Sequence, residues 1–175
     1  MAIEQPRYEV ERVAGGVEFR RYEPYLVAEC DLREVNDLGL ASNTGFRYLF
    51  NYISGENQSG TKISMTSPVQ QVPDQDGWRV SFVVPHEFYT KGAPAPRSPK
   101  VSVREVDSAL VAALRYRGFW NSEVFNAKRE QLLALLKAQG VAPLGEVFSA
   151  VYNPPLTPSF LRRNEVLVRV QGSAQ

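Results

Sequence analysis

The hydrophobic pattern of this chain repeats once, on either side of a proline-rich segment, and this repeat limits the folds that the chain can adopt. Residues 91–99 contain three prolines, which continue neither a helix nor an interior strand, so we expect them to link two halves. Each half reads as two alternating segments, one amphipathic helical segment and two further alternating segments. The repeat is about ninety residues long, which is too long for a solenoid and suits a duplicated half-domain.

The first half is expected to open with a hairpin. Residues 8–13 and 17–22 alternate in hydrophobicity on either side of a Gly15-Gly16 turn, and Pro24 is expected to bend a second strand that continues to Leu32.

A helix is expected next. Apolar residues recur there at helical spacing, with Asn43 or Thr44 as the expected N-cap and Gly55 at the end. Residues 63–72 and 78–84 then read as two more strands.

The second half follows the same order. Residues 101–106 and 110–116 read as strands, Asn121 or Ser122 as the cap of a helix closed by Gly140, and the last strands as 146–151 and 165–170. The expected fold class is therefore α+β: duplicated β-β-α-β-β halves, residues 7–90 and 100–171, form antiparallel sheets in a distorted barrel flanked by two helices. One domain of residues 1–175 would leave room for a ligand between its helix-sheet layers.

The composition disfavours several classes of site. The 175 residues include one cysteine and one histidine, so neither an internal disulfide nor a Cys/His zinc set can form. Basic and acidic residues nearly balance, with a net charge of +1, and their scatter along the chain disfavours nucleic acid as a partner. The sequence contains neither a signal peptide nor an apolar run long enough to span a membrane, so we expect a cytoplasmic protein.

Five short blocks, in order, resemble the SOUL haem-binding family. They are residues 52–57 at the expected helix end, 65–69, 82–85, 95–96, and 153–155 together with 162–166. Five ordered matches over about 120 positions are far more specific than a single short motif. The fold of that family, a duplicated antiparallel α+β barrel, agrees with the organisation read from the pattern.

The resemblance implies non-covalent binding of haem or a related tetrapyrrole in an open apolar groove, as a carrier, buffer or sensor. Haem would be a ligand rather than a requirement for folding, and a protein partner could use the same groove. The implied apolar lining is Phe46, Leu49, Phe50, Ile53, Met65, Leu156, Phe160 and Leu161. The implied partners of the haem propionates are Arg47, Lys62, Arg162 and Arg163.

His86 is the one conventional haem-iron ligand that the sequence offers, although a lone histidine in a turn is more often exposed or structural. Met65 and Cys30 are softer potential ligands, but their positions favour packing in the core. Tyr48 and Tyr52 could ligate ferric iron or stack on a macrocycle, or simply pack with the hydroxyl at the rim.

An enzymatic alternative centres on Glu165. A related superfamily, the gyrase-inhibitor-like small-molecule-binding domains, has a similar fold, and some members hydrolyse small substrates with a glutamate and a tyrosine. If Glu165 were buried beside Tyr116 or Tyr152, its pKa would be expected to rise, and it could act as a general acid or base. The charges of residues 162–165 also fit ordinary pairing at a strand start. Familiar hydrolase motifs are missing from the sequence, which favours a binding protein over an enzyme.

Overall fold

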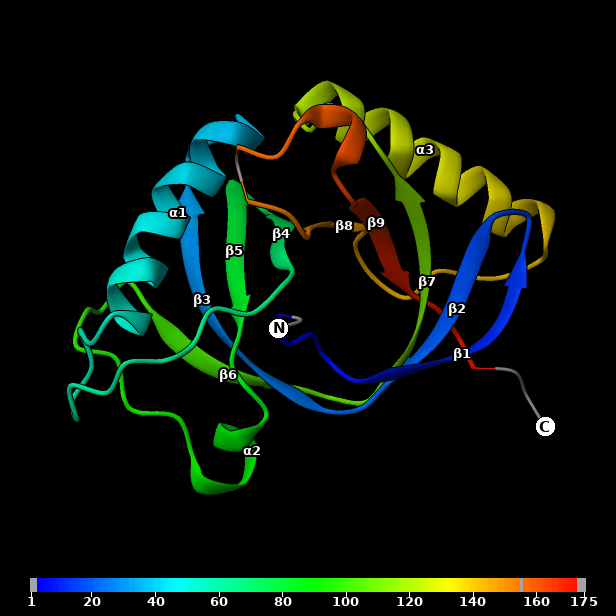
Figure 1. The fold of residues 1–175 in the computed structure, drawn as a ribbon. Coiled ribbons are helices and arrows are strands. Elements are labelled where there is room, and N and C mark those ends of the chain that lie inside the picture. The colour runs from blue at the N-terminus through cyan, green and yellow to red at the C-terminus, as the bar shows by residue number, and fades with distance from the viewer. Residues whose placement is uncertain (1–2, 155, 173–175) are drawn as a thin grey trace.

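The computed structural model describes residues 3–154 and 156–172, and its centre is one curved antiparallel sheet of nine strands (Figure 1). In sheet order the strands run β1-β2-β7-β9-β8-β4-β5-β3-β6. The bounds are β1 (Tyr8–Ala14), β2 (Val17–Tyr22), β3 (Tyr25–Arg33), β4 (Val69–Asp74), β5 (Gly77–Val83), β6 (Ser102–Val106), β7 (Ala109–Tyr116), β8 (Phe148–Val151) and β9 (Asn164–Arg169). The α+β class and the barrel-like curvature expected from the sequence are confirmed, but the strands form one continuous sheet.

Each half contributes one strand that pairs with the other half. β2 of the first half pairs with β7 of the second, β6 of the second half pairs with β3 of the first, and β4 and β8 join the halves at the centre. The expected hairpin of β1 and β2 is present. Pro24 lies between β2 and β3, and the chain changes pairing partners there, as a proline that cannot donate to the ladder favours.

Helix α1 (Leu38–Ile53) begins earlier than the sequence predicted. Its N-cap is Asp37, whose carboxylate accepts a hydrogen bond from the Leu40 backbone N–H at 2.8 Å, so the prediction of Asn43 or Thr44 was wrong. Leu38 and Ala41, one turn apart, are buried and extend the apolar stripe towards the N-terminus. Helix α3 (Ser122–Ala138) starts at its expected cap, where Asn121 accepts from the Val124 N–H.

Two local predictions also needed correction. Residues 63–68 are not in a strand, and β4 starts at Val69 instead of residue 63. A short helix, α2 (Glu87–Lys91), was not predicted, because five residues are too few to establish a helical period. A 3₁₀ turn, η1 (Ser159–Leu161), precedes β9.

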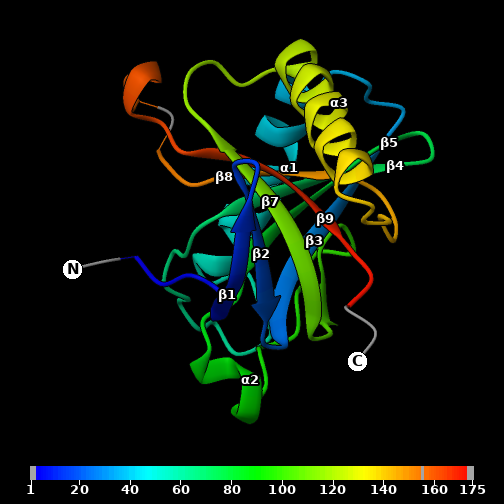
Figure 2. The same ribbon diagram turned by 90° about the vertical axis from the view of Figure 1, so that its right-hand side faces the viewer.

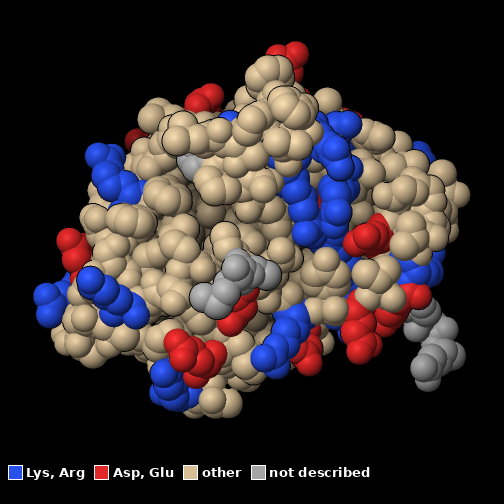
Figure 3. All heavy atoms as spheres, in the orientation of Figure 1, with Lys and Arg blue, Asp and Glu red and all other residues tan. Residues whose placement is uncertain are grey.

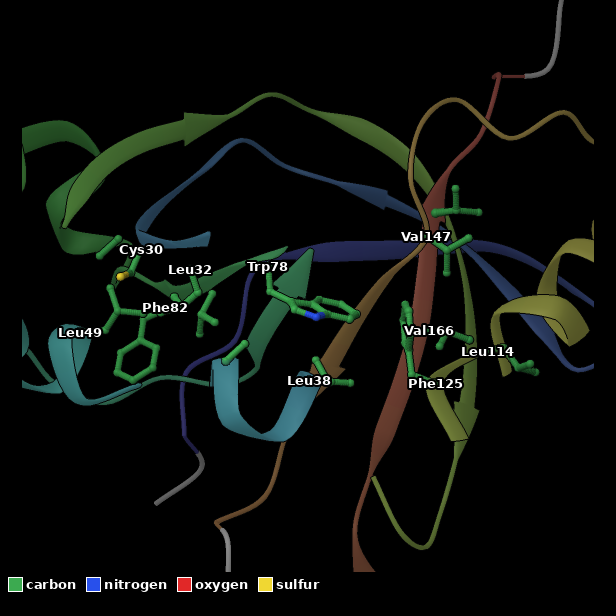
Figure 4. Close-up of a cluster of buried hydrophobic side chains, with 14 of the residues drawn as sticks. Cys30, Leu32, Leu38, Leu49, Trp78, Phe82, Leu114, Phe125, Val147 and Val166 are labelled. Carbon is green, nitrogen blue, oxygen red and sulfur yellow. The ribbon is translucent and has the colours of Figure 1, made fainter. Parts of the chain in front are cut away.

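The main core lies between the sheet and the two long helices, which sit outside its curve (Figure 1). Helix α3 covers β7 and β9 (Figure 2), and α1 covers β3 and β5. Figure 4 shows the cluster extending continuously from Leu49 to Phe125, with the Trp78 and Phe125 rings edge to face at 5.4 Å. A Cβ added at Gly45 would lie 2.7 Å from the Val80 Cβ, so glycine lets α1 approach the sheet this closely.

A second, smaller cluster lies on the opposite side of the sheet, which we call the inner face. Because side chains alternate along a strand, residues such as Tyr22, Ala113 and Leu167 point there while their neighbours enter the main core. Neither long helix covers this inner face.

Candidate functional site

Large exposed apolar side chains gather in two segments that the sequence predicted for the haem groove. Phe50 on α1 is 46% exposed and Met65 is 43% exposed, while Leu156 and Phe160 in the loop before β9 are 97% and 68% exposed. Leu161 is exposed as well. We call these five residues the outer apolar face. Figure 3 shows few charged side chains on the part of the surface over α1 and the approach to β4.

The α1 part of this face rests on a stacked aromatic pair. The Phe46 and Phe50 rings lie 5.9 Å apart and nearly parallel, and Phe46 meets the edge of Phe82 at 5.2 Å. The segment carrying Met65 runs beside the end of α1, where the Ile63 N–H donates to the Ile53 carbonyl at 2.8 Å.

Two predicted lining residues support this face from beneath. Leu49 and Ile53 are buried in the main core, so they do not reach the surface on which a ligand would rest. The loop residues form a second exposed group, and Ser159 accepts a hydrogen bond from the Gly118 N–H in the segment before α3. A haem-binding role for the whole set stays a prediction.

The four predicted propionate partners divide into two pairs. Arg47 and Lys62 are exposed, and neither side chain forms a hydrogen bond or ion pair with another residue in the described part of the chain. Arg162 is engaged locally, since its Nε donates to the Thr157 carbonyl at 2.8 Å. Arg163 contributes to a buried ion cluster. The first pair is therefore the freer to meet an anion.

The predicted iron ligands occupy different environments. His86 is exposed at the start of α2, where its backbone N–H donates to Glu4 at 2.7 Å and its ring stacks on Tyr89. Cys30 lies in the main core, as expected, whereas the expectation that Met65 packs in the core was wrong.

The two tyrosines of α1 also differ from each other. Tyr48 is half-buried, while Tyr52 is buried and donates its hydroxyl to the Pro94 carbonyl at 2.7 Å. Burial raises the pKa of Tyr52 to about 12, which disfavours phenolate ligation there. Iron ligation by His86 stays a prediction.

A buried ion cluster occupies the inner face. Glu165 on β9 is fully buried, and Arg20 on β2 donates to its two carboxylate oxygens at 2.8 and 2.5 Å. Arg163 approaches the same carboxylate to 3.1 Å and Arg115 approaches it to 3.5 Å, so three guanidinium groups face one carboxylate. Tyr152 lies beside the same carboxylate, close enough to affect its pKa, and the Arg163 guanidinium lies 3.9 Å from the centre of the Tyr152 ring.

This cluster corrects the expected protonation of Glu165. Burial alone would raise its pKa, but the hydrogen bonds and positive charge of Arg20 outweigh burial and lower the pKa to about 2. Burial and the neighbouring Glu165 charge raise the pKa of Tyr152 above its ordinary value. Glu165 is thus ionised at neutral pH, which disfavours the expected general-acid role there.

Beside this cluster, the inner face contains a cavity of about 150 Å³. Residues from both halves line it, including Tyr22, Tyr25, Phe148 and Tyr152, together with the charged Arg104, Asp107 and Arg169. Tyr22 and Tyr152 separate the cavity from the ion cluster, and Glu165 is not part of the lining.

None of the helices among the described residues is long and apolar enough to cross a membrane.

The family assignment rests on nearly the whole chain. A family profile described as "SOUL heme-binding protein" matches residues 3–169. The chain belongs to the SOUL haem-binding family. The resemblance found in the five sequence blocks is thereby confirmed. Pro155, part of the fifth block, lies outside the described residues.

Characterised relatives of the SOUL chain carry haem-binding names. It is 30% identical to heme-binding protein 1 of Mus musculus over 126 residues. This alignment covers 67% of this chain and 65% of that protein. A similar match to heme-binding protein 1 of Sus scrofa covers 64% of that protein, so the matched part spans just under two thirds of these two relatives. Heme-binding protein 2 of Homo sapiens is 25% identical over 97% of this chain.

Solved structures of other proteins share the fold of the SOUL chain. The EcmrR C-terminal domain superposes with a TM-score of 0.67 at 10% identity, covering 95% of this chain and 99% of that one. A hydrolase from Listeria innocua superposes with a TM-score of 0.56 at 9% identity, covering 89% and 91%. At such low identity these matches show a shared fold alone.

Sequence reasoning missed Arg20 as the partner of Glu165. In the sequence, Phe19 and Arg21 fall on one face of the strand and Arg20 on the other, and a charged residue at such a position is usually solvated. The burial of Arg20 depends on β2 pairing with β7 of the other half, which no local pattern reports. The pairing of strands between the halves was the missing information.

Proposed function

We propose that this SOUL chain binds haem or a related tetrapyrrole without covalent attachment, on the outer apolar face. The observation that carries the proposal is the concentration of exposed large apolar residues at Phe50, Met65 and the 156–161 loop, in a chain whose family is haem-binding. Clusters of this kind commonly mark binding surfaces. A role as carrier, buffer or sensor would follow from reversible binding.

The chemistry of this face suits a flat, amphipathic ligand. The Phe46–Phe50 pair offers an aromatic surface for the macrocycle, and the loop residues offer a second apolar surface. Arg47 and Lys62, which have no polar partner among the described residues, would meet the propionates.

Bound haem would supply an iron centre, while this face would supply binding and partial exclusion of water. His86 forms backbone hydrogen bonds with Glu4 and Tyr89, and its ring stacks on Tyr89; both partners are outside the outer apolar face. Binding through apolar area and propionate contacts therefore needs no histidine ligand. A His86→Ala protein is expected to keep the Soret spectrum of the wild-type complex.

A haemin titration with matched variants tests the proposal. The Soret band should report a dissociation constant below about 10 µM for the wild type, and Phe50→Ser combined with Phe160→Ser should weaken binding at least about tenfold, because each replacement removes exposed apolar area. The control is Val13→Ser on β1, whose side chain is 63% exposed and remote in sequence from the outer apolar face.

Two results would contradict the proposed site. Equal haemin affinity of the double variant and Val13→Ser would place the ligand elsewhere on the protein. Failure of the wild type to bind either haemin or protoporphyrin would reject the function itself.

A further inference from the structure

The cavity on the inner face is distinct from the outer apolar face, and contacts with neighbouring side chains hold its aromatic walls in place. Tyr22 accepts a hydrogen bond from the buried Arg20 Nη1 at 3.0 Å, and the Tyr152 ring packs against the Arg163 guanidinium at 3.9 Å. Tyr25 accepts from the Gln70 side-chain amide at 3.2 Å. Fixed aromatic walls lower the entropy that a ligand loses on binding, which favours small ligands that make few contacts.

The cavity is open to solvent, and its inner space matches the size of one aromatic ring. An apolar cavity of about 150 Å³ accepts benzene, and this cavity has the same volume. Tyr22 and Tyr25 lie 6.2 Å apart at an angle of 47°, and Phe148 and Leu167 add further apolar lining. A planar aromatic ring can contact such surfaces on its face and on its edges.

Polar groups at the Tyr25 end of the cavity require an acceptor. The Tyr25 oxygen accepts the Gln70 hydrogen bond, and its own proton has no acceptor within the described ranges. Arg169 lines the cavity, and its guanidinium forms no hydrogen bond or ion pair with any residue that the structure describes. Arg104 also lines this cavity but is committed to Glu29 at 3.0 and 3.2 Å.

The charges near Tyr25 are positive. Burial raises the pKa of Tyr25, while the positive charges of Arg104 and Arg169 oppose that rise, so both guanidinium groups lie close enough to act on its hydroxyl. Asp107 is the one acidic side chain among the lining residues, and its charge acts on Tyr89, outside the cavity. A phenolic donor and an unpaired guanidinium together fit a carboxylate.

We propose that this cavity binds a single-ring aromatic carboxylate, with the ring between the tyrosine walls and the carboxylate at the Tyr25 hydroxyl and Arg169. The site is independent of haem. It joins the two halves of the fold, because its lining comes from strands on both sides of the central β4–β8 pair.

The test uses 4-fluorobenzoate as the probe, followed by ¹⁹F NMR with the chain of residues 1–175. We expect a dissociation constant below about 1 mM for 4-fluorobenzoate, and at least about tenfold weaker binding of 4-fluorobenzamide and 4-fluorobenzylamine, which lack the carboxylate. Arg169→Gln should weaken 4-fluorobenzoate about tenfold, because it removes a charge-assisted contact from an exposed side chain whose loss leaves no partner unpaired.

Asp107→Asn is the matched control of opposite charge. For a carboxylate ligand it should leave affinity unchanged or strengthen it, whereas for a cationic ligand it would weaken binding. Val72→Phe, at a half-buried position that lines the cavity, should block the probe, and a melting curve for each variant would show that it is folded.

Three outcomes would overturn the proposal: no probe binding at millimolar concentration, 4-fluorobenzylamine binding as tightly as 4-fluorobenzoate, or full binding by folded Val72→Phe. Phe50→Ser, on the outer apolar face, should leave 4-fluorobenzoate binding intact. Loss of probe binding in that variant would place the probe on the outer apolar face and would likewise reject a separate inner site.

Discussion

The outer apolar face and the inner face of the sheet both combine aromatic rings with arginines, but they hold these side chains in different ways. On the outer apolar face, Phe50 and the loop residues are exposed, and Arg47 has no partner in the described part of the chain. On the inner face, Arg20 and Glu165 are fully buried and joined by two short hydrogen bonds.

This difference indicates two kinds of recognition on one fold. An open surface gains affinity from the apolar area that a large flat ligand covers, and it tolerates ligands that vary in shape. A fixed, tyrosine-walled cavity gains affinity from preorganised contacts, so it selects by size and charge. The ion cluster fixes the inner walls, because Arg20 donates a hydrogen bond to Tyr22 and the Arg163 guanidinium packs on the Tyr152 ring.

The largest expected effect comes from breaking that cluster. Arg20→Met leaves the Glu165 carboxylate buried without its principal partner, so it should lower the free energy of unfolding by about 3 kcal/mol or more, measured by urea denaturation. Arg21→Met is the control on the same strand, since the Arg21 side chain is 46% exposed and pairs with Glu11 at the surface. That variant should cost less than about 1 kcal/mol.

A double variant separates loss of packing from loss of charge pairing. Arg20→Met combined with Glu165→Met removes both buried charges and should be more stable than Arg20→Met alone. If Arg20→Met proved no more destabilising than Arg21→Met, the cluster would not be holding the inner face. Haemin affinity of the folded Arg20→Met protein should match that of the wild type, because the outer apolar face does not depend on the cluster.

The acid dependence of stability is the second way to test the contrast between the two faces. The pKa of Glu165 is lowered to about 2 in the folded protein, from 4.5 as its ordinary value. A lowered folded-state pKa stabilises the protein fully above the unfolded pKa, and this stabilisation is lost as the pH falls from about 4.5 to about 2. The shift is worth on the order of 3 kcal/mol.

The measurement compares the wild type with Glu165→Gln by chemical denaturation between pH 6 and pH 2. The wild type should be the more stable at pH 6, and its advantage should shrink steadily below about pH 4.5. An advantage that stays constant down to pH 2 would mean that Glu165 keeps an ordinary pKa in the folded state.

The elements that the sequence predicted well are those specified by local pattern. The α3 cap at Asn121, the hairpin of β1 and β2 and the linker after α2 each depend on nearby residues. The start of α1 was missed because Gly39 in its first turn and the polar residues 42–44 that follow dilute the helical period.

The candidate sites were predictable to different degrees for the same reason. Exposed residues of the outer apolar face belong to blocks that resemble the SOUL family, so their involvement could be inferred from the sequence. The inner cavity draws on Tyr25, Gln70 and Arg169, which come together only through non-local strand pairing. The direction of the Glu165 pKa shift likewise depends on Arg20, which lies 145 residues away in sequence.

The smallest expected effect concerns the free cations beside the outer apolar face. Arg47→Gln and Lys62→Gln should each weaken haemin binding about twofold to fivefold, the range of an exposed ion pair, without changing the free energy of unfolding by more than about 0.5 kcal/mol. The same variants should bind protoporphyrin dimethyl ester as the wild type does, since the ester carries no propionate charge. Arg163→Gln should do the reverse, lowering stability more than haemin affinity, because its guanidinium contacts the buried Glu165. If Arg47→Gln weakened haemin and ester binding equally, the Arg47 side chain would pack against the macrocycle instead of pairing with a propionate. The comparison of the two faces would then lose its distinction between free and committed arginines.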